Sequence, residues 1–179
     1  MYVDGMSGVA VAARGGVTVA QRAGGPANRA TGTACTPETR FQIASVSKQF
    51  TAAAVLLLAG QARLSLDDPV SRWLSGSPQA WEAIKIRHLL SHTAGLGHWS
   101  HFPALNLYRP VEPAEERAIF QRGALKFAPG SRYGYSSPGY VLLAWIVEQA
   151  GDQPYASFLA DRIFTPLGMR TAAAGERPG

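Results

Sequence analysis

The residues best suited to chemistry are a serine and a lysine three positions apart, Ser45 and Lys48. Residues at i and i+3 share one face of a helix, so their side chains are expected to meet. A serine hydroxyl is a weak nucleophile that needs a base, and a lysine can be that base where burial lowers the ammonium pKa. The spacing alone is a weak signal, because a helix-capping serine followed by a solvent-reaching lysine looks the same. A lysine inside an apolar helix is costly, however, and this favours a function.

A tyrosine and a serine further along the chain are the second candidate. Tyr135 and Ser137 lie in the segment YGYSS at 133–137, directly before a proline that suits the first turn of a helix. A tyrosine hydroxyl on a loop near a serine–lysine pair can relay a proton. An arbitrary tyrosine more often packs its ring and hydrogen-bonds its hydroxyl, so this segment alone leaves both interpretations open.

Three histidines form the third candidate. His88, His92 and His98 have the histidine spacing of the zinc-protease motif H-E-x-x-H-x-x-G-x-x-H. The position of its general-base glutamate holds Leu89, so a metal-bound water would lack a proton acceptor. We therefore expect no metal site and keep a His-ligated zinc hydrolase as a minor alternative.

The elements that must position these residues run from strands to helices. Two β-prone runs around a Gly-Gly pair predict a β-hairpin over residues 8–23. Residues 24–40 carry Gly, Pro, Asn and Thr without periodicity and predict a loop. The nearly unbroken apolar stretch 46–59 indicates a helix that is buried on all sides. A mostly helical region is expected over 45–165.

Composition limits the classes of function. Of 179 residues, 46% are hydrophobic and 16% are charged, which argues against intrinsic disorder. The net charge of +5 comes from scattered arginines, so we expect no nucleic-acid binding. The single cysteine, Cys35, excludes an intrachain disulfide, and no apolar run is long enough to span a membrane. The first residues lack the features of a signal peptide, so the chain as it stands is expected to be cytoplasmic, with its final localisation open.

Several segments together resemble the serine beta-lactamase-like family, which includes class C beta-lactamases, D-alanyl-D-alanine carboxypeptidases and esterases of beta-lactamase fold. Their order and spacing agree with the family over residues 8–170. The matching segments are FQIASVSKQFT (41–51), LSLDDPV (64–70), IRHLLSHTAGL (86–96), the second motif within PGSRYGYSS (129–137) and IFTPLGM (163–169).

The resemblance implies an acyl-transfer mechanism that needs no cofactor. It implies that Ser45 is the acylated nucleophile and Lys48 its proton acceptor or electrostatic partner. Tyr135 would assist as general base and later protonate the leaving group. The substrate would be a small-molecule amide or ester: a beta-lactam, a D-Ala-D-Ala peptide or a simple ester.

Two departures from the family pattern change these expectations. Ser137 stands where the second motif has an asparagine, so a hydroxyl replaces an amide at the expected substrate-binding position. The third motif, Lys/His-Ser/Thr-x-Gly, does not follow in residues 171–179. We therefore expect weak or no activity from this chain alone.

The resemblance predicts an α/β fold of the α+β type, namely the beta-lactamase/transpeptidase-like fold in incomplete form. Residues 1–179 would be a single, apparently truncated domain that lacks the C-terminal sheet strands. An open sheet edge suggests another class of function, a non-catalytic binding or assembly module. Its partner would be a second copy of the chain or a complementing C-terminal segment.

Overall fold

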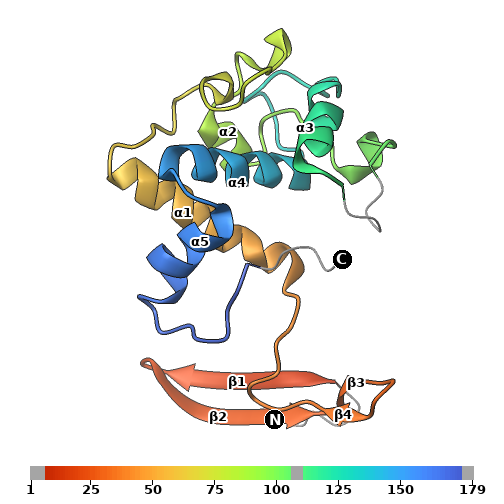
Figure 1. The fold of residues 1–179 in the computed structure, drawn as a ribbon, viewed down its shortest axis with the longest axis vertical. Helices are drawn as coiled ribbons and strands as arrows, with labels where there is room; N and C mark the ends of the chain where they lie inside the picture. The colour runs from red at the N-terminus through yellow and green to blue at the C-terminus, as the bar shows by residue number, and fades with distance from the viewer. Residues whose placement is uncertain (1–6, 106–110, 175–179) are drawn as a thin grey trace. The chain divides into compact units, whose positions relative to one another are not determined.

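The computed structural model describes residues 7–105 and 111–174. Contacts divide the chain into two compact units, Met1–Gln42 and Ile43–Gly179, here called the hairpin unit and the helical unit. The order of elements confirms the predicted fold class, because strands come first and helices make up most of the rest (Figure 1). Among the described helices, none is long and apolar enough to cross a bilayer.

The hairpin unit is built on one antiparallel pair of strands, β1 (Gly8–Arg14) and β2 (Val17–Gly24). Gly15 and Gly16 join the strands with φ of 57° and 79°. A two-residue turn that matches the twist of the strands needs positive φ at both central positions, which glycine adopts without steric cost. The Gly-Gly pair therefore fixes where the hairpin reverses.

A second short pair of strands, β3 (Pro26–Asn28) and β4 (Thr33–Ala34), lies where the sequence predicts only a loop. The side chain of Asn28 explains the difference. Its Oδ1 accepts the backbone N–H groups of Ala30 and Thr31 and so closes a tight turn between the two strands. The loop prediction for 24–40 is wrong at these five residues.

The helical unit is organised around its longest helix, α4. Figure 1 shows α4 beside α1 in the upper part of the picture, and α4 also packs against α2 and α5. Its side chains Leu142, Leu143 and Ile146 are fully buried. The helices of the unit are α1 (Lys48–Gly60), α2 (Ile86–Leu90), α3 (Pro113–Gln121), α4 (Ser137–Gly151) and α5 (Tyr155–Leu159), and a π-helical turn follows over Ala160–Phe164.

Helix α1 differs from the prediction of a helix buried on all sides. Its buried residues are Thr51, Ala54, Val55 and Leu58, which recur at helical spacing and form one face. The leucines next to them, Leu56 and Leu57, are 54% and 40% exposed. The continuous apolar run concealed this difference between the faces, because both faces are apolar.

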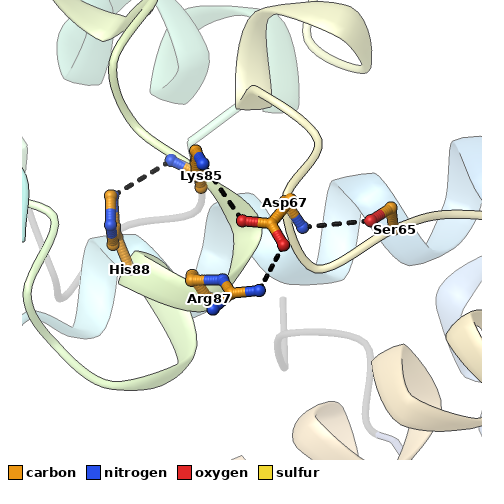
Figure 2. A network of polar contacts seen from close by, with 5 residues as sticks. All are labelled: Ser65, Asp67, Lys85, Arg87 and His88. Atoms are coloured by element: carbon orange, nitrogen blue, oxygen red, sulfur yellow. Dashed lines mark hydrogen bonds and ion pairs between the residues drawn. The ribbon is translucent and has the colours of Figure 1, made fainter.

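A network of polar contacts anchors the start of α2 (Figure 2). Asp67 pairs with both Lys85 and Arg87, and its own backbone N–H donates to Ser65 Oγ. The two cations lower the pKa of the Asp67 carboxyl, with the hydrogen bond from Lys85 as the largest cause. The ion pairs are exposed and contribute little. Backbone bonds from Ile86 and Arg87 to the 66–68 segment hold α2 in place.

Candidate active site

Ser45 lies in a 3-10 turn, Ala44–Ser47, that leads directly into α1. In such a turn the side chains at i and i+3 eclipse each other, so Ser45 and Lys48 meet more directly than on an α-helix. Ala44, immediately before Ser45, has φ of 44°. This left-handed conformation costs an L-residue about 1–2 kcal/mol, and such strain gathers at functional sites.

The structure brings together the three residues predicted to be catalytic. Lys48 Nζ donates to Ser45 Oγ over 3.1 Å, and Ser45 Oγ lies 2.7 Å from Tyr135 OH. Tyr135 comes from the loop before α4, ninety positions along the chain from Ser45. Ser45 is exposed and Lys48 is half-buried, so the nucleophile is accessible while its partner is partly shielded from solvent.

The ionisation of Tyr135 is strongly shifted. The interaction with the Lys48 ammonium, followed by the hydrogen bond with Ser45, lowers the pKa of Tyr135 from 10.0 to about 8. The cause is electrostatic, since a positive charge and a hydrogen-bond donor both favour the phenolate. A phenolate beside a serine hydroxyl can accept its proton.

Lys48 is surrounded by hydroxyl groups and aromatic rings. Besides Ser45, its Nζ donates to Ser137 Oγ over 3.2 Å. The same nitrogen lies 5.2 Å from the ring centroid of Tyr135 and 5.5 Å from that of Tyr140, within the range of cation–π attraction. Ser137 begins α4 and is only 9% exposed, so its hydroxyl faces the lysine. Its expected contact with a substrate remains a prediction.

The three histidines of the zinc alternative make separate contacts with backbone amides. The Nδ1 atoms of His88, His92 and His98 accept the N–H groups of Lys85, Ser136 and Ser137 respectively. No group of three potential ligands occurs among residues 7–105 and 111–174. Two of these histidines thus touch the segment that carries Tyr135, a role that the zinc-like spacing concealed.

Gly95 lies in the turn after α2, between the Ser45–Lys48 turn and the Tyr135 loop in the sequence, and this turn is tightly packed. This residue has φ of +81°, and a Cβ added there would lie 2.2 Å from the backbone oxygen of Phe127. The Gly95 carbonyl accepts the backbone N–H of Lys126 over 2.8 Å. Only glycine combines this φ with so close an approach of two chain segments.

Comparisons with known proteins identify the family of the chain. The beta-lactamase family model matches residues 2–178. Esterase EstB of Burkholderia gladioli is 38% identical over 178 residues, covering 90% of this chain and 45% of the esterase. A penicillin-binding protein of Bacillus subtilis is 38% identical over 138 residues, covering 72% of this chain and 29% of that protein. The structure of an octameric penicillin-binding protein homologue from Pyrococcus abyssi superposes with a TM-score of 0.79 at 30% identity, covering 90% of this chain and 38% of that one.

The chain therefore belongs to the beta-lactamase family and has the beta-lactamase/transpeptidase-like fold. It spans less than half the length of the curated relatives it matches. The resemblance carried by the five sequence segments is confirmed at the level of the family.

Proposed function

We propose that this chain carries the nucleophile and the proton-transfer groups of a serine hydrolase that works through an acyl-enzyme. One observation carries the proposal: Ser45 Oγ lies within hydrogen-bond distance of both Lys48 Nζ and Tyr135 OH, although the tyrosine comes from a distant part of the chain. A nucleophile held by a base and by a neighbouring cation is the arrangement that covalent catalysis needs.

Each group has a defined step in the proposed reaction. Ser45 Oγ attacks the substrate carbonyl carbon while its proton passes to the Tyr135 phenolate. Lys48 donates to Ser45 and stabilises the negative charge that Tyr135 carries before the transfer. The tyrosine then protonates the leaving group as its bond to the carbonyl carbon breaks. Water attacks the Ser45 ester, releases the acid and restores the serine hydroxyl, so the cycle needs no cofactor.

We propose an ester as the preferred substrate among ester, beta-lactam and D-Ala-D-Ala peptide. Ser137 supports this choice, because its short hydroxyl is nearly buried and accepts from Lys48. It offers less reach than the amide of an asparagine for binding a substrate amide. An ester has no N–H group that needs an acceptor, so the absence of the asparagine amide matters less for an ester than for an amide substrate.

Turnover by the chain alone is proposed to be slow. No Lys/His-Ser/Thr-x-Gly segment follows Tyr135 in the sequence, and in the family this segment lines the pocket and supplies an oxyanion donor. Loss of one such donor costs about 10²–10³ in rate.

A fluorescent phosphonate tests the proposal on the full chain. We expect labelling of the peptide that contains Ser45, identified by mass spectrometry, and slow hydrolysis of p-nitrophenyl esters. Ser45→Ala is the direct control, and Ser47→Ala is the matched one, because Ser47 lies in the same turn but donates to the Ala44 carbonyl. Equal labelling of unchanged and Ser45→Ala protein would sink the proposal.

A second proposal concerns assembly. In the described residues β1 and β2 form a sheet of only two strands, and Val11, Val17 and Val19 on it are 57–66% exposed. Open edges and apolar faces of this kind recruit further strands. A homologue of known structure is octameric. We propose pairing with a second copy or with a complementing C-terminal segment, and light scattering that shows only a 19.1 kDa monomer would refute self-pairing.

A further inference from the structure

We propose that His92 and His98 are positioning residues that hold the Tyr135–Ser137 segment in its reactive place by accepting two consecutive backbone N–H groups. The inference rests on the proposed role of Tyr135. It assigns to His92 and His98, two of the three histidines with zinc-motif spacing, the function of positioning Tyr135 for acyl transfer.

The two hydrogen bonds act on neighbouring amides. His92 Nδ1 accepts from Ser136 N over 3.2 Å, and His98 Nδ1 accepts from Ser137 N over 3.3 Å. These amides directly follow the reactive tyrosine, so a shift of either one moves the Tyr135 hydroxyl. Two acceptors on consecutive amides fix the direction of the backbone as well as its position.

Further contacts tie the same two segments together. The Ser136 hydroxyl donates to the Gly97 carbonyl over 2.8 Å, and the Gly134 amide donates to the His92 carbonyl over 2.8 Å. His92 has φ of 57°, a left-handed conformation in which both its carbonyl and its ring reach the 134–136 segment. Residues 92–98 therefore bind the backbone of the tyrosine loop at several successive positions.

The histidine rings also enclose the tyrosine ring. The ring centroid of Tyr135 lies 4.5 Å from that of His92 and 5.3 Å from that of His98. The His92 ring also lies 5.1 Å from the ring of Tyr140, whose hydroxyl donates to the Leu90 carbonyl. Rotation of the Tyr135 side chain away from Ser45 is opposed on two sides.

Both imidazoles must be neutral to do this. A protonated ring carries hydrogen on both nitrogens, so Nδ1 would donate and repel the amide it now accepts from. Burial and the charge of Lys48 lower the pKa of both histidines below 6.5, which keeps the acceptors available in weak acid. The titratable groups that face the pair are Lys48 from α1, Tyr133 and Tyr135 from the loop, Tyr140 from α4 and His101.

A matched pair of variants at position 98 tests the inference on the full chain. His98→Asn keeps an acceptor, because Asn Oδ1 stands as far from Cβ as Nδ1 does. His98→Leu has similar bulk and no acceptor. We expect His98→Leu to lower the phosphonate-labelling rate of Ser45 about tenfold, the effect of leaving one backbone donor without its partner. His98→Asn should stay within about threefold of the unchanged chain, since its hydrogen bond is restored.

The ionisation of Tyr135 is the second readout and does not require labelling. It is followed by tyrosinate absorbance and assigned with Tyr135→Phe. His98→Leu should move the Tyr135 pKa from about 8 toward 10, because the phenol leaves Lys48 and Ser45. His98→Asn should not move it. Equal pKa values in the two variants would overturn the inference, and so would nitrogen-15 NMR that shows Nδ1 of His98 protonated at neutral pH.

The pH profile separates positioning from a merely structural role. As pH is lowered, the labelling rate of the unchanged chain should fall first near pH 8, where Tyr135 takes up its proton. It should fall a second time, more steeply, below the pKa of the two histidines. The double variant His92→Asn/His98→Asn should lose only the second fall, because asparagine does not titrate and tolerates left-handed φ. His88→Asn removes another histidine with a lowered pKa and should keep both falls.

Failure of the inference can be told apart from failure of the proposed function. If Ser45 is not labelled in any variant, the proposed function fails, while the Tyr135 titration still decides whether the histidines position the loop. If His98→Leu does not fold, the His98→Asn titration and the double-variant profile decide. A double variant that keeps the steep fall refutes the inference.

Discussion

Replacement of Tyr135 with phenylalanine removes one hydroxyl and leaves the ring between the two histidines. That hydroxyl lies 2.7 Å from Ser45 Oγ, and Lys48 keeps its own hydrogen bond to the serine. The variant therefore loses a proton acceptor and keeps the cation. A positioned general base contributes about 10²–10⁴ in rate, which corresponds to about 3–5 kcal/mol of the barrier. We expect the labelling rate of Ser45 to fall by about 10², the lower end of this range, because the Lys48 cation still stabilises negative charge that develops on the Ser45 oxygen.

The assay is the second-order rate constant for phosphonate labelling, measured between pH 6 and 10. With a Tyr135 pKa of about 8, the phenolate fraction rises with pH through that value and then levels off, so the rate should do the same. Tyr135→Phe should show the lower rate at every pH and no inflection near pH 8. The matched control is Tyr133→Phe, two residues away on the same loop, with a ring 5.9 Å from that of His92.

Three results would refute this reasoning. A Tyr135→Phe variant that labels within about twofold of the unchanged chain would show that the hydroxyl is not the proton acceptor, because general bases contribute far more. An inflection near pH 8 that survives in the variant would show that another group titrates there. A fall in Tyr133→Phe as large as that in Tyr135→Phe would point to loop packing instead.

Three further predictions address charge, packing and pH. Lys48→Met should raise the Tyr135 pKa toward 10 in an absorbance titration, because the cation that favours the phenolate is gone. Gly95→Ala should lower the free energy of unfolding in urea by about 2 kcal/mol or more, since its Cβ would clash with Phe127 and its φ is left-handed. The control is Gly60→Ala in α1, whose Cβ would meet nothing within 4 Å. This variant should raise the free energy of unfolding by about 0.5–1 kcal/mol. The lowered pKa values of His88, His92 and His98 mean that the unfolded chain binds protons first, so stability in urea should fall as pH drops below 6.5 and level off below the folded pKa values.

The sequence predicted Ser45, Lys48 and Tyr135 as candidate catalytic residues, the first two from their local spacing and all three from the family resemblance. Ser45 and Lys48 meet through a spacing of three, which both kinds of helical turn bring together. The Gly15-Gly16 pair likewise determines the hairpin turn by local backbone preference alone. Where the signal is local, the prediction and the structure agree.

Signals that depend on distant contacts were not visible in the sequence. The roles of His92 and His98 depend on two amides about forty positions further along the chain. Leu56 and Leu57 are exposed because the opposite face of α1 packs against the other helices, and a continuous apolar run does not show which face will pack. The turn at Asn28 is a side-chain effect that composition alone describes as a loop.

The surroundings of Lys48 explain how one cation can serve two hydroxyl groups. Among the described residues, the ion pairs involve Arg72, Lys85 and Arg87, and none involves Lys48. Its partners are two serine hydroxyls and two tyrosine rings, all of them neutral when Tyr135 keeps its proton. A carboxylate beside the lysine would satisfy the charge permanently and disfavour a second anion nearby. With no such ion pair to Lys48 among the described residues, its charge lowers the pKa of Tyr135 to about 8, and the phenolate that forms above this pH lies against the Ser45 hydroxyl that must lose its proton.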